Sequence, residues 1–68
     1  RFFFFSNEGN EPEHVHVEHG DAHAKFWLDP VDLAYSTAFK VRDLRRAREL
    51  VEAHRQEFWR RWHEHFGA

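Results

Sequence analysis

No cysteine occurs in this chain of 68 residues, prolines and glycines are few, and no long apolar run is present. The lack of cysteine excludes disulfides and thiolate metal sites, and it fits a reducing cytoplasm. A membrane-spanning helix needs about 18 or more consecutive apolar residues, so we expect no membrane contact. We expect no secretory leader either, because the apolar run of residues 2–5 is short and an acidic segment follows it.

The length allows one small domain over residues 1–68, since such a chain buries only about 60 % of its unfolded surface. This limit argues against a second domain, a large active-site cavity and a deeply buried cofactor. Residues 1–39 hold two basic and seven acidic side chains, whereas residues 40–68 hold eight basic and five acidic ones. Such a division indicates either ion pairs within the protein or a basic surface for an anionic partner.

Three segments of the acidic half have the pattern of β-strands, at about residues 2–6, 14–19 and 22–28. The first is rich in phenylalanine, which suits a pleated sheet. The second alternates strictly between polar and apolar residues, the period of a half-buried strand. Gly20-Asp21 separates the second from the third and predicts a type II′ hairpin turn. We therefore expect an antiparallel meander of three or four strands, the fourth at about residues 33–38.

The turn at Gly20-Asp21 determines which residues of the hairpin face each other. Val17 is expected to pair with Ala24 and His16 with Lys25, which sends apolar and polar side chains to opposite faces. We predict that one face joins the core and that the other is a histidine face. The core face holds Val15, Val17, Ala24 and Phe26. The histidine face holds His14, His16, Glu18, His23, Lys25 and Trp27.

From residue 41 onwards the apolar residues recur at intervals of three and four, which predicts a single helix over about residues 41–66. Gly67 follows it as a helix stop. We expect an α+β fold in which the sheet packs against this one long C-terminal helix. The helix residues expected against the core face are Leu44, Ala47, Leu50 and Val51.

A single helix of this length would extend beyond its own sheet. It would be about 39 Å long, whereas a strand of five to seven residues spans about 17–23 Å. No proline or glycine interrupts the helix to let it fold back, so large aromatic side chains would be exposed. We therefore predict association with a second copy of the chain or with a small cognate partner protein. The predicted interface residues are Trp27, Phe58, Trp59, Trp62 and Phe66.

The segment from Asn10 to Val17, a proline followed by His-x-His-Val, resembles the bacterial family called domain of unknown function 4160. Residues 24–31 and the helix that ends in His-Phe-Gly are similar to the same family, so the likeness covers nearly the whole chain. Glu13 stands where a second proline is common, and Lys40 where a helix N-cap serine is common. The resemblance implies a small cytoplasmic protein that works with a second small protein, as in a toxin–antitoxin-like or regulatory pair.

The histidine face is compatible with two chemistries. His14 and His16 project from one strand, beside the cross-strand pair of Glu18 and His23, and these four are candidate ligands for Zn²⁺, Ni²⁺ or Cu²⁺. Alternatively, His14 and His16 act as general acid and base on RNA, with Lys25 or an arginine stabilising the phosphorane, in a small metal-independent ribonuclease-type toxin. If neither holds, the histidines lie on a solvated sheet face.

The first part of the predicted helix is a candidate nucleic-acid surface, because its arginines fall away from the apolar stripe and can face phosphates. These arginines are Arg42, Arg45, Arg46 and Arg48. The overall acidity of the chain argues against strong non-specific binding. Among all these alternatives we favour an interaction or regulatory protein that works through protein–protein association. The sequence does not decide whether the protein is also an enzyme.

Overall fold

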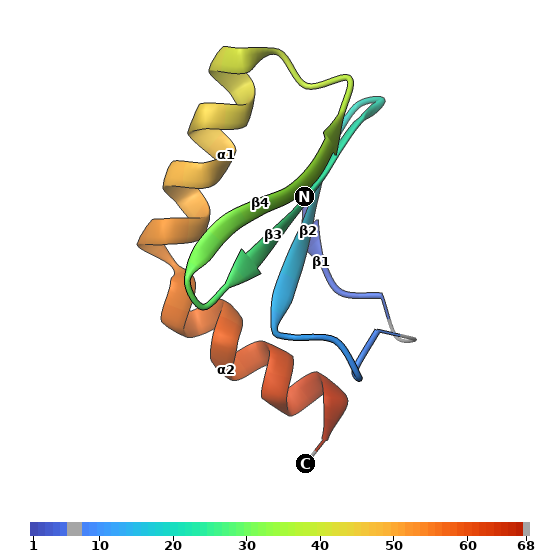
Figure 1. Ribbon diagram of the computed structural model, residues 1–68, viewed down its shortest axis with the longest axis vertical. Helices are drawn as coiled ribbons and strands as arrows, with labels where there is room; N and C mark the ends of the chain where they lie inside the picture. The colour runs from blue at the N-terminus through green and yellow to red at the C-terminus, as the bar shows by residue number, and fades with distance from the viewer. Residues whose placement is uncertain (6–7, 68) are drawn as a thin grey trace.

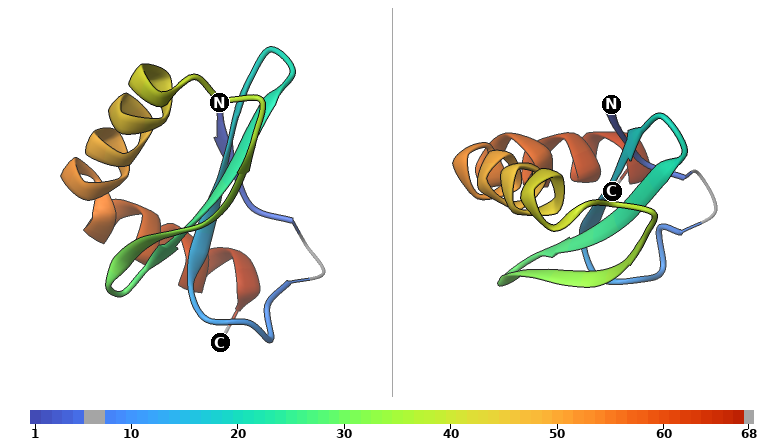
Figure 2. Two further views of the ribbon diagram at one scale, coloured as in Figure 1. Left: turned by 45° about the horizontal axis from the view of Figure 1, so that its top comes forward. Right: turned by 90° about the horizontal axis from the view of Figure 1, so that it is seen from above.

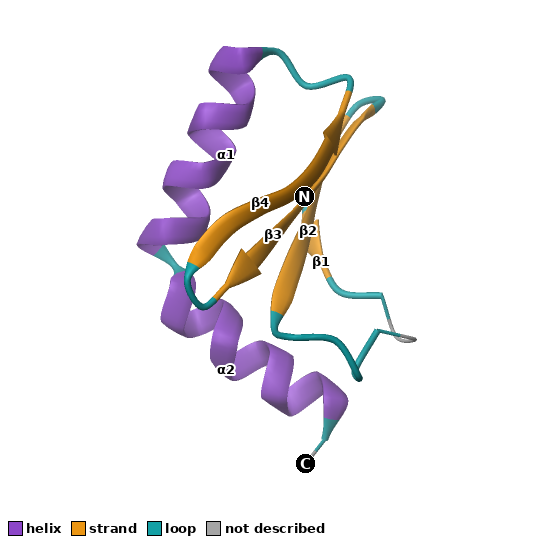
Figure 3. Cartoon of the chain, in the orientation of Figure 1, coloured by secondary structure: helices purple, strands orange, loops and turns teal. Residues whose placement is uncertain are grey.

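The computed structural model describes residues 1–5 and 8–67, which form a four-stranded antiparallel sheet and two helices (Figure 1). The strands are β1 (Phe2–Phe3), β2 (His14–His19), β3 (Ala22–Leu28) and β4 (Val31–Thr37), in that order across the sheet. The helices α1 (Val41–Ala53) and α2 (Arg55–Phe66) follow the strands (Figure 3). The predicted α+β class and antiparallel meander are confirmed, whereas the single long helix is wrong. Neither helix in this described part is long and apolar enough to cross a membrane.

The turn between β2 and β3 gives this hairpin the predicted register. His14 pairs with Trp27 at one end and His19 with Ala22 at the other, and the pairs between them follow without a shift. Gly20 has a φ of 59°, which the first loop residue of a type II′ turn requires and which a residue without a Cβ atom adopts easily. The polar and apolar side chains of the hairpin are therefore separated as the alternation predicts.

The outer strands differ from their predicted ranges. Among the described residues, β1 pairs with β2 through Phe2 and Phe3. Ser6, the last residue of the predicted first strand, lies outside the described residues. β4 is a strand as expected, but it begins earlier, because Asp29-Pro30 alone forms the turn before it. It ends before Ala38, where φ is 65° and the backbone is no longer extended.

The core lies between one face of the sheet and the helices (Figure 2). Its buried members are Val15, Val17, Ala24, Phe26, Leu28, Ala47 and Val51. Leu50, which we also expected there, is 40 % exposed. Because successive side chains of a strand point to opposite faces, the packing that buries the valines of β2 directs His14 and His16 to the other face.

The C-terminal part breaks into two helices at His54, which has a φ of −113° and a ψ of 21°. These angles lie outside the helical range. Arg55, the first residue of α2, holds the break in place. Its Nε donates to the carbonyl oxygen of Leu28 at 2.6 Å, and its Nη2 lies 2.9 Å from Oδ1 of Asp29. The start of α2 is thus bound to the turn between β3 and β4.

The break directs the aromatic side chains of α2 back onto the sheet. Trp62 is 3 % exposed, and Phe58 and Trp59 are half-buried against the core. Burying a large apolar side chain stabilises a fold by about 2–3 kcal/mol, whereas each hydrogen bond disrupted at the break costs about 1 kcal/mol. Folding back is therefore favourable even without a proline or glycine. The expected overhang does not exist, and association cannot be inferred from it.

Candidate functional site

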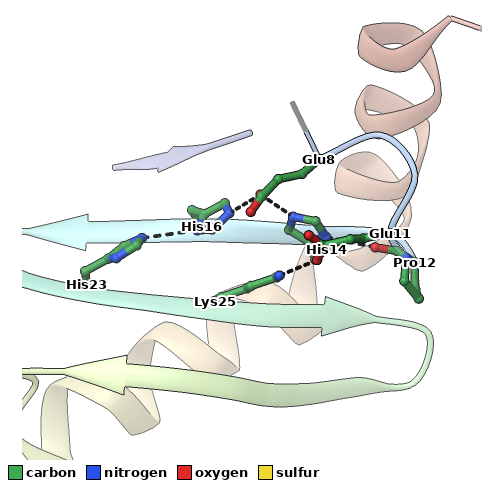
Figure 4. A network of polar contacts seen from close by, with 7 residues as sticks. All are labelled: Glu8, Glu11, Pro12, His14, His16, His23 and Lys25. Carbon is green, nitrogen blue, oxygen red and sulfur yellow. Dashed lines mark hydrogen bonds and ion pairs between the residues drawn. The ribbon is translucent and has the colours of Figure 1, made fainter. Parts of the chain in front are cut away.

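The histidine face of the sheet is covered by the N-terminal part of the same chain. Residues 8–13 cross to this side and lie over the start of β2 and the end of β3 (Figure 4). His14 and His16 are 0 % exposed, and Lys25 is 8 % exposed. The alternative of a solvated face is therefore wrong for these three side chains.

Alternating phenylalanines of the N-terminal segment close both faces of the sheet. Phe2 and Phe4 pack on the side of the helices, against the core. Phe3 and Phe5 lie on the opposite side, with ring centroids 5.4 and 4.5 Å from that of His16. This arrangement explains why aromatic residues occupy successive positions in this segment.

Both buried histidines direct the same ring nitrogen at one carboxylate oxygen (Figure 4). Nε2 of His14 lies 2.7 Å and Nε2 of His16 2.6 Å from Oε1 of Glu8. One nitrogen of each ring and the carboxylate oxygen all lie within 4.8 Å of one another. The period of β2 brings the two imidazoles to one face, and the loop before β2 brings the carboxylate to them. Two imidazoles and one carboxylate at this spacing can hold a transition metal ion.

The other ring nitrogen of each histidine also has a partner. Nδ1 of His14 lies 2.8 Å from the carbonyl oxygen of Pro12, and Nδ1 of His16 lies 3.1 Å from Nε2 of His23. A carbonyl oxygen only accepts hydrogen bonds, so His14 donates with its Nδ1. In metalloproteins, a hydrogen bond at the ring nitrogen remote from the metal orients the ligating histidine.

The hydrogen bond to Pro12 determines which nitrogen of a neutral His14 carries the proton, and therefore what His14 presents to Glu8. A neutral His14 that donates with Nδ1 has a lone pair on Nε2, and this lone pair faces a carboxylate oxygen. Burial raises the pKa of Glu8, but hydrogen bonds from His16 and His14 outweigh burial and hold it below the ordinary value of 4.5. Glu8 is therefore a carboxylate at neutral pH. A lone pair and a carboxylate oxygen are both electron donors, so a metal cation shared between them would satisfy this contact.

The environment of His16 favours its neutral form. Burial lowers the pKa of His16 below the ordinary value of 6.5, although hydrogen bonding and charge attraction from Glu8 raise it. The neighbouring His14 and His23 lower the pKa further, since positive charges on neighbouring imidazoles repel each other. Because metal ligands are neutral imidazoles, His16 does not have to lose a charge to bind a metal.

Two more glutamates hold the loop that carries Glu8. Oε1 of Glu11 lies 2.5 Å from Nζ of Lys25 on β3, and Oε2 of Glu13 lies 2.9 Å from Nε2 of His63 on α2. The ammonium group of Lys25 is also 4.6 Å from the ring centroid of Trp27. The loop is thus tied to both the sheet and α2.

Of the four predicted metal ligands, the structure brings His14 and His16 together. Glu18 instead pairs with Arg1 at 2.9 Å. His23 contacts His16 but does not belong to the group of possible ligand atoms around Glu8. The predicted set thus shares His14 and His16 with the group that the structure brings together.

Glu8 was missed because strand alternation says nothing about residues outside the hairpin. One signal for it is present in the sequence. Three glutamates, Glu8, Glu11 and Glu13, closely precede a strand with two histidines, and such a loop keeps carboxylates within reach of that strand. In the structure each of these glutamates contacts a histidine or a lysine.

The candidate catalytic and nucleic-acid residues lie on different sides of the sheet. His14, His16 and Lys25 are buried on the histidine face, and the ammonium group of Lys25 is bound to Glu11. The arginines lie on α1, which covers the core face (Figure 2). They are Arg42, Arg45, Arg46 and Arg48. The two sets do not form one site, and the geometry gives little support to a ribonuclease.

The predicted interface residues make contacts within the chain. Trp62 is buried, and its ring centroid lies 4.6 Å from that of His14. The other predicted interface residues are half-buried: Trp27, Phe58, Trp59 and Phe66. None of these five is among the exposed large apolar residues of the described part of the chain.

No curated protein and no solved structure matches this chain. Residues 1–63 match a protein family, and this range includes all four strands as well as Glu8, His14 and His16. The family is described as a domain of unknown function, DUF4160. The likeness seen at the His-x-His-Val strand is thereby confirmed, and the chain belongs to the DUF4160 family.

Proposed function

We propose that the protein binds a divalent transition metal ion, Zn²⁺ first of all, between Glu8, His14 and His16. The observation that carries the proposal is the convergence of two buried imidazole Nε2 atoms on one carboxylate oxygen. Imidazole nitrogens and carboxylate oxygens are common zinc ligands, and imidazole also suits Ni²⁺ and Cu²⁺. The hydrogen bond at each Nδ1 adds the outer contact that ligating histidines use.

A metal ion needs only a small adjustment of these groups. The two nitrogen–oxygen contacts of 2.6 and 2.7 Å are lengths of charge-assisted hydrogen bonds. Ligand atoms at about 2.0–2.1 Å from a tetrahedral zinc lie about 3.3 Å apart, so Glu8 has to withdraw by roughly 0.6 Å. Glu8 lies in the loop before β2 and not in the sheet ladder, so it can move without disturbing β2.

The surroundings favour a structural or regulatory metal over a catalytic one. Both imidazoles are fully buried, and the Glu8 side chain is 20 % exposed. A metal held between these groups would be largely shielded from a substrate. A bound ion would instead fasten the loop to β2, and its binding free energy would stabilise the folded state.

The test is the zinc content and zinc affinity of protein purified without a histidine tag. We expect one Zn²⁺ per chain, and an affinity at least about tenfold lower in each of Glu8→Gln, His14→Gln and His16→Gln. His19→Gln is the matched control, because His19 is an exposed histidine on the same strand. Titrations with Ni²⁺ and Cu²⁺ then identify the preferred ion. Parent protein that binds no metal, or ligand variants that bind as tightly as the parent, would contradict the proposal.

A second candidate function is association, either with a second copy or with a small cognate partner. Its support now comes from β4, which borders the described sheet and has Tyr35 44 % exposed. A border strand can pair with a strand of another chain. Sedimentation of the parent and of Tyr35→Lys tests this function, and a parent that stays monomeric at all concentrations argues against self-association. A toxin–antitoxin-like pairing and a cytoplasmic location stay predictions.

A further inference from the structure

We propose that His23 positions His16 for metal binding, through a hydrogen bond between the two rings that reverses its direction when the metal binds. The inference rests on the proposed function, because it concerns the same site. It assigns a role to a histidine that is not itself a ligand. The carrying observation is the contact of 3.1 Å between Nδ1 of His16 and Nε2 of His23.

The two rings lie nearly parallel to each other among aromatic neighbours. The planes of His16 and His23 differ by 17°, and the ring of Phe3 lies within 20° of parallel to both. Phe5 meets both rings edge-on, and Tyr35 meets His23 edge-on. Contacts on several sides limit rotation of both rings, so this packing helps to keep the two nitrogens within hydrogen-bonding distance.

A bond between two imidazole nitrogens contains one proton, so one ring donates and the other accepts. Without metal, the single proton of a neutral His16 lies on Nε2, where it is donated to the Glu8 carboxylate at 2.6 Å. Nδ1 of His16 is then an acceptor. His23 has to donate to it, and its own proton lies on Nε2.

Metal binding requires the opposite arrangement. A metal at Nε2 of His16 would need the lone pair there, so the Nε2 proton would pass to solvent and His16 would carry its proton on Nδ1. That proton comes from Nε2 of His23, which becomes the acceptor. His23 takes a replacement proton on Nδ1 from solvent, which it can reach because its side chain is partly exposed. One proton leaves the pair for solvent and one returns from it, so the number of protons on the pair is unchanged.

Two substitutions separate this role from simple packing. His23→Phe keeps a flat ring but leaves the Nδ1 proton of zinc-bound His16 without an acceptor. His23→Gln keeps a group that can donate in the metal-free protein and accept in the metal-bound one. We expect His23→Phe to lower zinc affinity about 10–100-fold and His23→Gln to lower it by less than about threefold. His19→Gln, on the exposed end of β2, is the control and is expected to bind zinc like the parent.

The ring tautomers provide a readout that a packing role would not change. Long-range ¹H–¹⁵N correlation spectra of His16 are expected to show the proton on Nε2 in the metal-free protein and on Nδ1 after one equivalent of Zn²⁺. An unchanged tautomer on loading, or a His23→Phe variant that binds zinc like the parent, overturns the role of His23. A metal-free parent with the proton on Nδ1 of His16 also overturns it. Parent protein that takes up no zinc overturns the proposed function itself, whichever tautomer His16 has.

Discussion

Glu8 and His16 both have folded-state pKa values below their ordinary ones, although for different reasons. Burial is the larger cause at His16 and disfavours its charged form. At Glu8 the hydrogen bonds from the two imidazoles outweigh burial and favour the charged form. The site thus places a neutral imidazole beside a carboxylate. Protonation of either group at low pH is expected to lower the stability of the folded state.

Stability is expected to fall on acidification in the presence of a chelator. As pH falls below 6.5, the unfolded chain protonates His16 before the folded chain does, and below 4.5 the same holds for Glu8. The free energy of unfolding is therefore highest above the unfolded pKa of His16 and decreases as pH falls through the two lowered pKa values. Urea unfolding between pH 8 and pH 4 measures this slope. His16→Gln is expected to flatten its upper part and His19→Gln to leave it unchanged, whereas identical slopes in all three proteins would exclude a role for His16.

Gly9 is expected to resist substitution because of its contact with α2. A Cβ atom there would lie 2.5 Å from Cδ1 of Phe66, closer than real contacts allow. We expect Gly9→Ala to lower the free energy of unfolding by about 1–3 kcal/mol, the range for overpacking. In a Phe66→Ala background the same substitution is expected to cost much less, because the obstructing ring is gone. An equal cost in both backgrounds, measured by denaturant unfolding, would disprove the contact.

At the scale of elements, one side chain anchors the break between α1 and α2 to the sheet. Arg55→Gln removes the bonds to the Leu28 carbonyl and the Asp29 carboxylate, and we expect a loss of about 1–2 kcal/mol. Arg60→Gln on the same helix is the control. Its ion pair with Glu64 is exposed, so we expect a change within about 0.5 kcal/mol. Equal effects of the two substitutions would show that Arg55 does not hold the break.

The core face of the hairpin and the partly exposed Leu50 of α1 are expected to respond differently to charge. Val17→Asp buries an unpaired carboxylate against the helices, at a cost of about 3 kcal/mol or more, and it is expected to unfold the protein. Leu50→Asp places the same group on a residue that is 40 % exposed, and we expect about 1 kcal/mol or less. Circular dichroism melting of both variants checks this order, and a Leu50→Asp protein that unfolds like Val17→Asp would contradict the described packing.

The sequence predicts some of these elements well because the relevant forces are local. The Gly20-Asp21 turn and the alternation of His14–His19 are enough to determine the register of β2 and β3. The helix break has no local signal, because it depends on Arg55 reaching a turn that is distant in sequence. Glu8 was missed for a similar reason, because the alternation of polar and apolar residues in a strand carries no information about where the preceding loop packs. The two residues of the candidate site that lie on a strand were predicted, and the one that lies on a loop was not.

At the scale of the whole molecule, the loop before β2 connects every layer. Glu8 binds the histidines of β2, Glu11 binds β3 through Lys25, and Glu13 binds α2 through His63. A metal at the first of these contacts would strengthen the closure of the loop over the sheet. Because a bound metal stabilises the folded state in proportion to its affinity and concentration, metal supply would control the stability of the whole domain.

X-ray absorption at the zinc edge tests the proposed ligand set most directly, on protein loaded with one equivalent of Zn²⁺. The predicted spectrum contains two imidazole ligands and at least one oxygen ligand at about 2.0–2.2 Å. His16→Gln is expected to lose one imidazole contribution, and His19→Gln to lose none. A zinc environment with no imidazole, or one that is the same in the parent and in His16→Gln, would show that Glu8, His14 and His16 do not form a metal site.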